Sequence, residues 1–190
     1  MRVATEGIMY PKDAKAALLP YYESLNDLVF SSFVEIPHAA WSKCKDELDN
    51  AFSTLKGAKP SHVFVLGPLH KGRVSYEDPA LVYAPFDGSL SGSDWEIKLQ
   101  VPFALSQLVC FSDDICSEEQ SLEIVAPYLS LFFEDVPVCY LLATEGGDAV
   151  KKIASIIKKV FPKALVFISN NKETCCGGMW KEAFADGNRT

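Results

Sequence analysis

Residues 61–70 read Ser-His-Val-Phe-Val-Leu-Gly-Pro-Leu-His, and the apolar run that ends at Leu66 decides the fold. A strand that is apolar at nearly every position, rather than at every second one, is typical of a parallel sheet that is covered on both faces. Gly67 and Pro68 end the run, and His70 follows just beyond them. The stretch therefore predicts a buried strand with a histidine past its carboxyl end.

Strands and helices alternate on both sides of this run. Residues 29–36 are rich in β-branched and aromatic side chains and stop at Pro37, which indicates another strand. Residues 39–55 carry apolar side chains at three- and four-residue spacings, as an amphipathic helix does. Two further strands are predicted at 137–142 and 164–168, with a helix at 148–160 between them. The alternation predicts an α/β fold with a mostly parallel sheet and helices on both faces.

The remaining segments complete one domain that spans residues 1–190. A proline divides or bends the first helical segment, a long irregular loop holds two short strands, and a Ser-Glu-Glu-Gln sequence resembles the capping box of a later helix. We expect helical segments at 12–28, 117–133 and 179–184, loop strands at 80–84 and 96–101, and fraying at 185–190. The sequence contains no internal repeat and no long linker that would divide the chain.

Composition excludes several classes of partner. The net charge is -7, and the lysines are scattered or paired, so we expect no nucleic-acid partner. The sequence has no stretch of roughly 18 apolar residues that could cross a membrane, and no secretory signal. We therefore expect a cytoplasmic protein with reduced cysteines. A small-molecule or protein partner and the oligomeric state stay open.

Three potential metal ligands share one predicted edge of the sheet. His38 and His70 each follow a strand, and Cys176 lies in the loop after the last strand. Ligands of open α/β sheets bind beyond the carboxyl ends of the strands. Two imidazoles and a thiolate can bind zinc, iron or copper, although a histidine after a strand is often only a hydrogen-bonded turn residue. His62 lies at the amino end of its strand, on the opposite edge of the sheet, and is expected to be a structural or surface residue.

Several motifs occur in the order found in a known family. The chain resembles the Memo-like family, also called AmmeMemoRadiSam system protein B, whose fold is related to that of the class III extradiol dioxygenases, which use non-haem iron. The resemblance rests on Glu6-Gly7-Ile8-Met9-Tyr10-Pro11, Ile36-Pro37-His38-Ala39-Ala40-Trp41, Leu66-Gly67-Pro68-Leu69-His70-Lys71, Glu119-Gln120-Ser121-Leu122-Glu123-Ile124 with Pro127-Tyr128, Ile168-Ser169-Asn170 and Cys176-Gly177. These motifs cover residues 6 to 178, nearly the whole chain.

The resemblance implies a metal site formed by His38, His70 and Cys176, with iron or copper as the metal and zinc as the alternative. Cys175 could replace Cys176, because only a short segment precedes the pair in this chain. The residues that the resemblance implies around the ligands are Glu123, Gln120, Lys71 and Ser169.

This chain departs from the family pattern in ways that bear on catalysis. Lys71, Gln120 and Asn170 stand where the family has two histidines and an aspartate, so proton-transfer groups are lost. The sequence leaves open a metal-dependent redox or oxygenase-type enzyme and a non-catalytic binding module with a degenerate site. A structural relic is a third alternative. In both functional alternatives, the nitrogens of His38 and His70 should approach within roughly 3–4 Å, because metal–nitrogen bonds are near 2 Å long.

Overall fold

A computed structural model describes residues 5–26, 32–70, 81–143, 147–170 and 178–186. Its eight strands form one mixed sheet in the order β1-β8-β2-β7-β3-β6, with β5 paired to β7 and β4 paired to β5. The strands are β1 (Phe33–Pro37), β2 (Val63–Pro68), β3 (Val82–Ala84), β4 (Gly88–Ser91), β5 (Glu96–Leu99), β6 (Cys110–Phe111), β7 (Val138–Ala143) and β8 (Leu165–Asn170). Strands β1, β8, β2 and β7 are parallel, whereas β3 is antiparallel to β7. The predicted α/β class and mostly parallel sheet are confirmed.

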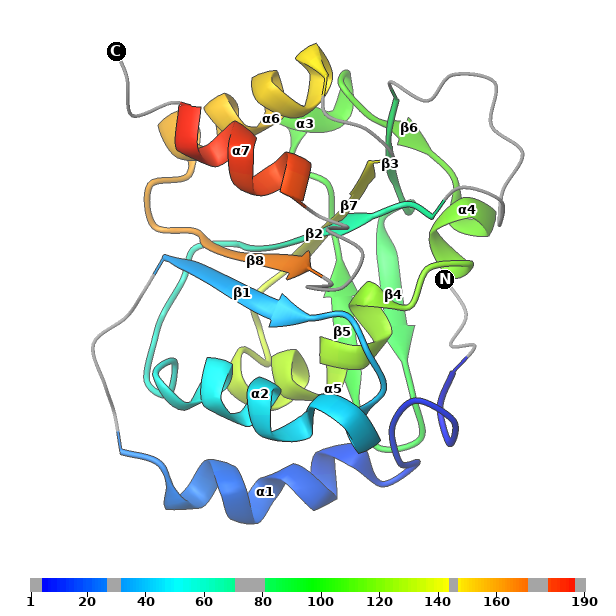
Figure 1. The fold of residues 1–190 in the computed structure, drawn as a ribbon, viewed down its shortest axis with the longest axis vertical. Helices are drawn as coiled ribbons and strands as arrows, with labels where there is room; N and C mark the ends of the chain where they lie inside the picture. The colour runs from blue at the N-terminus through cyan, green and yellow to red at the C-terminus, as the bar shows by residue number, and fades with distance from the viewer. Residues whose placement is uncertain (1–4, 27–31, 71–80, 144–146, 171–177, 187–190) are drawn as a thin grey trace.

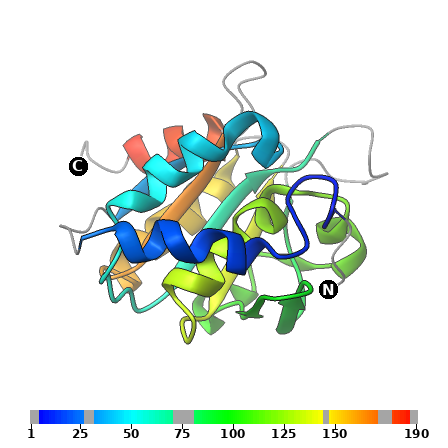
Figure 2. The same ribbon diagram turned by 90° about the horizontal axis from the view of Figure 1, so that it is seen from below.

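Helices cover both faces of the sheet (Figures 1 and 2). One face carries α1 (Ala14–Ser24), α2 (Trp41–Ser53) and α5 (Ser121–Phe132), and the other carries α3 (Phe103–Ser106), α6 (Asp148–Val160) and α7 (Gly178–Asp186). Successive side chains of strand β2 point alternately into two hydrophobic cores, one on each face of the sheet. Val63 and Val65 belong to the core under α2 and α5, while Phe64 and Leu66 belong to the core under α6 and α7. Burial on both faces explains why every position of this run is apolar.

The helix predicted from residue 117 to residue 133 is wrong in its first turn. The chain instead forms α4 (Asp113–Ser117), breaks at residues 118–120, and resumes as α5. Ser112 caps α4, because its hydroxyl accepts a hydrogen bond from the backbone N–H of Ile115. Asp113 and Asp114 occupy the first turn, where carboxylates stabilise the helix dipole. Ser117 therefore ends a helix rather than beginning one.

A hairpin of β4 and β5 lies within the segment expected to be an irregular loop. Only β5 was predicted, because the Gly-Ser-Leu-Ser sequence of β4 has little intrinsic strand preference. Pairing creates the strand instead, with Leu90 of β4 opposite Ile97 of β5 and both side chains buried. The short elements α3 and β6 were also not predicted.

Several predicted features lie partly outside the described residues. The start of the first predicted strand (residues 29–31), residue 80 and the last four residues lie outside them. The first helical segment is one helix, α1, which contains Pro20. Among the described helices, none is long and apolar enough to span a membrane.

Candidate metal centre

His38 and His70 meet because strand β8 lies between the strands that precede them. Ile168 of β8 pairs with Glu35 of β1 on one side and with Leu66 of β2 on the other. Strands β1 and β2 therefore end at the same level of the sheet, and the imidazole rings of His38 and His70 lie with their centroids 5.0 Å apart. The two histidines thus lie side by side, as expected from their places after neighbouring strand ends, whereas the expected distance of roughly 3–4 Å between their nitrogens stays a prediction.

Glu119 is the third member of the cluster, and it was not predicted. It lies in the break between α4 and α5, and its side chain is completely buried, whereas those of His38 and His70 are 12% and 30% exposed. Carboxylate oxygen Oε1 accepts a hydrogen bond from the backbone N–H of His70 at 2.9 Å and lies 2.8 Å from Nδ1 of the same residue. The carboxylate thus fixes both the backbone and the ring of His70.

The second carboxylate oxygen of Glu119 is in an unusual position. Oε2 is buried, has no hydrogen-bond partner among the described residues, and lies 4.0 Å from Nε2 of His38. A buried acceptor without a partner costs roughly 1–3 kcal/mol, and more when it is charged. This oxygen therefore needs a partner that the described side chains do not supply.

The opposite nitrogen of the His38 ring contacts two serines. Nδ1 lies 2.9 Å from the hydroxyl of Ser169 in β8 and 3.1 Å from the hydroxyl of Ser121, the first residue of α5. Both serines are at most 1% exposed. The His38 ring is thus held against two buried hydroxyl groups.

Gly67 allows α5 to approach the sheet at this point. A Cβ atom on Gly67 would lie 2.8 Å from Oγ of Ser121 and 3.0 Å from a methyl group of Leu142, so no larger residue fits without a shift. The carbonyl oxygen of Gly67 accepts a hydrogen bond from Nε1 of Trp180 in α7. Helices on both faces are therefore joined to β2 directly beneath the cluster.

The donor set fits a metal ion. One atom from each of His38, His70 and Glu119 can be chosen so that all three lie within 4.8 Å of one another. Two metal–ligand bonds of about 2.0–2.2 Å can span the 4.0 Å between Nε2 of His38 and Oε2 of Glu119. Two histidines and a carboxylate are the donors of non-haem Fe(II) sites and of one class of zinc enzymes. An ion at this point would supply the missing partner of Oε2.

The other predicted site residues are distributed more widely. Cys175, Cys176 and Lys71 lie outside the described residues. Gln120 precedes the first residue of α5 and is half-buried. Glu123 is buried in the first turn of α5, where Oε2 accepts hydrogen bonds from the backbone N–H and hydroxyl of Thr5. Glu123 therefore anchors the N-terminal segment.

Cys116, which lies near Glu119, is a poor metal ligand. Burial raises the pKa of the Cys116 thiol well above its usual value, and the neighbouring carboxyl groups of Asp113 and Glu119 raise it further. Metal ligation requires the thiolate. Cys116 consequently remains protonated at ordinary pH.

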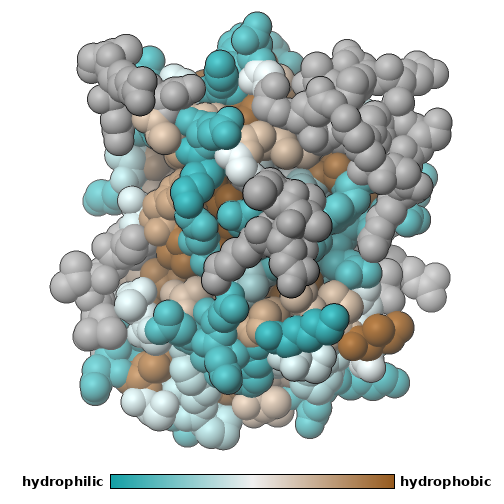
Figure 3. All heavy atoms as spheres, in the orientation of Figure 1, coloured by the Kyte–Doolittle hydropathy of each residue, from teal (hydrophilic) through white to brown (hydrophobic). Residues whose placement is uncertain are grey.

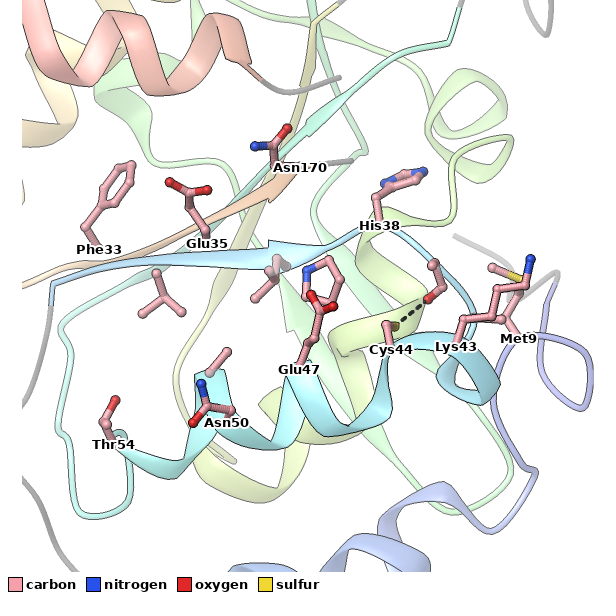
Figure 4. Close-up of a pocket in the computed structure, with 16 residues that line it drawn as sticks. Met9, Phe33, Glu35, His38, Lys43, Cys44, Glu47, Asn50, Thr54 and Asn170 are labelled. Atoms are coloured by element: carbon pink, nitrogen blue, oxygen red, sulfur yellow. Dashed lines mark hydrogen bonds between the residues drawn. The ribbon is translucent and has the colours of Figure 1, made fainter. Parts of the chain in front are cut away.

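A groove of about 920 Å³ runs along β1 and α2 and reaches His38 (Figure 4). All five residues of β1 line it, together with Asn170 at the end of β8 and one side of α2. The side-chain oxygen of Asn170 is buried and has no hydrogen-bond partner in the described part of the chain. Figure 3 shows apolar surface beside β1 with hydrophilic residues around it. The cluster is thus connected to a groove of mixed polarity.

Comparison with known protein families and with curated proteins found no match to this chain.

Proposed function

We propose that this protein binds a divalent metal ion through one ring nitrogen of His38, one ring nitrogen of His70 and the carboxylate of Glu119. The supporting observation is the buried Oε2 of Glu119, which has no hydrogen-bond partner in the described residues and faces Nε2 of His38 at 4.0 Å. Burial of such an oxygen is costly unless something positive pairs with it. A cation satisfies the oxygen and uses both imidazoles.

The donor chemistry favours Fe(II) or zinc over copper. A carboxylate is a harder ligand than the thiolate in the predicted His-His-Cys site, and soft thiolates are what select Cu(I). Participation of Cys176, or of Cys175 in its place, remains part of the proposal, as does membership of the Memo-like family. Support for the family comes from the Pro-His and Leu-Gly-Pro-Leu-His motifs, which carry His38 and His70.

Three protein ligands leave coordination positions open, and an ion with open positions can polarise a bound water, oxygen or substrate. The residues of this chain would bind and orient. Glu119 holds the His70 ring through Oε1, and the groove beside β1 gives a ligand access to His38. We propose a metal-dependent redox or oxygenase-type enzyme as the first function.

A binding module without turnover is the second candidate. The observation that favours it is Gln120, which lies half-buried between Glu119 and Ser121 where the family pattern has a histidine. An amide cannot transfer protons, and a positioned proton-transfer group contributes typically 10²- to 10⁴-fold in rate. The groove is of a size that accepts small ligands.

Metal content and metal affinity test the metal site, which both candidate functions share. Protein purified without oxygen should contain about one Fe or Zn per chain by mass spectrometry of the elements. His70→Ala and Glu119→Gln should lower the affinity for added Zn(II) by more than the roughly 10- to 100-fold that loss of an outer partner costs. His62→Ala is the matched control, because His62 lies before the amino end of β2 and packs against Phe161. Equal affinity in all four proteins would refute the site.

Oxygen consumption separates the two candidates. Fe(II)-loaded protein is mixed with catechol-like or thiol substrates, and His70→Ala is the negative control. Turnover that disappears in this variant supports the enzyme. Metal binding that is lost in the variants, without any turnover in the wild type, supports the binding module.

A further inference from the structure

We infer that Ser121 and Ser169 form a two-hydroxyl clamp that holds His38 with its proton on Nδ1, so that Nε2 is presented as a ready metal ligand. The inference rests on the proposed metal site and assigns positioning residues to it. Its basis is the pair of contacts at 3.1 and 2.9 Å between the two hydroxyls and Nδ1.

Histidine ligands usually donate their second ring N–H to an outer partner, which is a carboxylate, a backbone carbonyl or a water. His70 has such a partner in Oε1 of Glu119. His38 has two serine hydroxyls in the same position relative to its ring. A hydroxyl oxygen carries two lone pairs, so either serine can accept the Nδ1–H.

The other nitrogen of the ring faces the proposed site. Nε2 of His38 lies 4.0 Å from Oε2 of Glu119, which is beyond hydrogen-bond distance but within the span of two metal–ligand bonds. An ion between these atoms would bind the lone pair of Nε2, and the proton of the neutral ring is then on Nδ1. The clamp and metal ligation therefore require the same tautomer.

The clamp is rigid because its two arms come from different elements of the core. Ser169 pairs with Ile36 in the register of β8 and β1, and it is completely buried. Ser121 begins α5 and reaches the ring because Gly67 leaves room for its hydroxyl. Neither hydroxyl is exposed to bulk water that would compete for the ring.

The experiment measures the proton position and the metal affinity separately. The chain has three histidines, so the ring nitrogens can be assigned in ¹⁵N spectra of ion-free protein. The wild type should show His38 protonated on Nδ1. The double variant Ser121→Ala/Ser169→Ala should shift the ring towards the Nε2–H form and lower the Zn(II) affinity about 10- to 100-fold, as expected for loss of outer partners. Each single variant should lose less.

Ser130→Ala is the matched control, because Ser130 is also a buried serine of α5. It should leave both the tautomer of His38 and the Zn(II) affinity unchanged, and circular dichroism should confirm that every variant folds. An Nε2–H ring in the wild type, or a double variant that keeps the Nδ1–H form, would overturn the clamp even if the protein binds zinc. If the wild type binds no metal but the double variant still changes the tautomer, the clamp stands and the proposed function fails.

Discussion

Gly67→Ala should destabilise the protein through one close contact. The new Cβ would lie 2.8 Å from Oγ of Ser121, whereas ordinary contacts begin at 3.4 Å, so the Ser121 side chain, α5 or β2 must move by about 0.6 Å. Overpacking of a well-packed core typically costs about 1–3 kcal/mol. A chain of this size loses roughly 2–4 °C of melting temperature per kcal/mol. We therefore expect a decrease of about 2–12 °C.

The same substitution should also weaken metal binding, because Ser121 is displaced from Nδ1 of His38. Thermal unfolding by circular dichroism measures the first effect, and Zn(II) titration measures the second. Gly88→Ala is the matched control, since a Cβ there meets nothing within 4 Å. If Gly67→Ala melts with the wild type and binds zinc equally well, then the close approach of α5 to β2 does not constrain the site.

Three other residues and the metal itself give further predictions. Trp180→Phe removes the indole N–H that donates to the carbonyl of Gly67 and should cost roughly 0.5–1.5 kcal/mol in urea unfolding, the typical net contribution of one hydrogen bond. Burial, followed by the charge of Glu47, raises the pKa of Cys44 to about 11, so its alkylation rate, followed by mass spectrometry, should still be rising above pH 9; a plateau below pH 9 would contradict this. Burial lowers the pKa of His62 below 6.5, so the unfolded chain takes up its proton first as the pH falls, and stability decreases from about pH 6.5 downwards. An NMR titration of His62 above 6.5, or an equal decrease in His62→Gln, would disprove this assignment. Removal of the ion by a chelator should lower stability by about 2.7 kcal/mol if the free metal was at 100 times its Kd, and no change in melting temperature would argue against the site.

The sequence predicted the parts of the site that depend on strands. Continuous apolar runs mark buried parallel strands, and the carboxyl ends of such strands share one edge, so His38 and His70 could be placed together without coordinates. Glu119 could not, because Ser117 and Gln120 match a capping box and extend the predicted helix through it. The competing signal was Ser112 followed by two aspartates, which starts a separate short helix.

Other features of the fold depend on contacts between residues that are far apart in the sequence or on different strands, and a local sequence pattern does not predict such contacts. The hairpin strand β4 has only Leu90 as an apolar residue, and its structure depends on Ile97 across the hairpin. The contacts of Ser121 with His38 and of Glu123 with Thr5 join residues 83 and 118 positions apart. Such distances along the chain are set by the topology of the sheet, which the sequence constrains only as a class.

Strand β8 has a consequence for how the site is assembled during folding. The chain has already supplied His38, His70 and Glu119 when residue 119 is reached, yet β1 and β2 are not neighbours in the sheet. Within the sheet they are joined by β8, which begins at Leu165 and fills the space between them. A nascent chain that lacks this strand has every residue of the cluster but not the strand that sets the spacing of the two histidines. We therefore expect the cluster to form only after β8 has been inserted, so that the metal affinity of the proposed site would report this insertion.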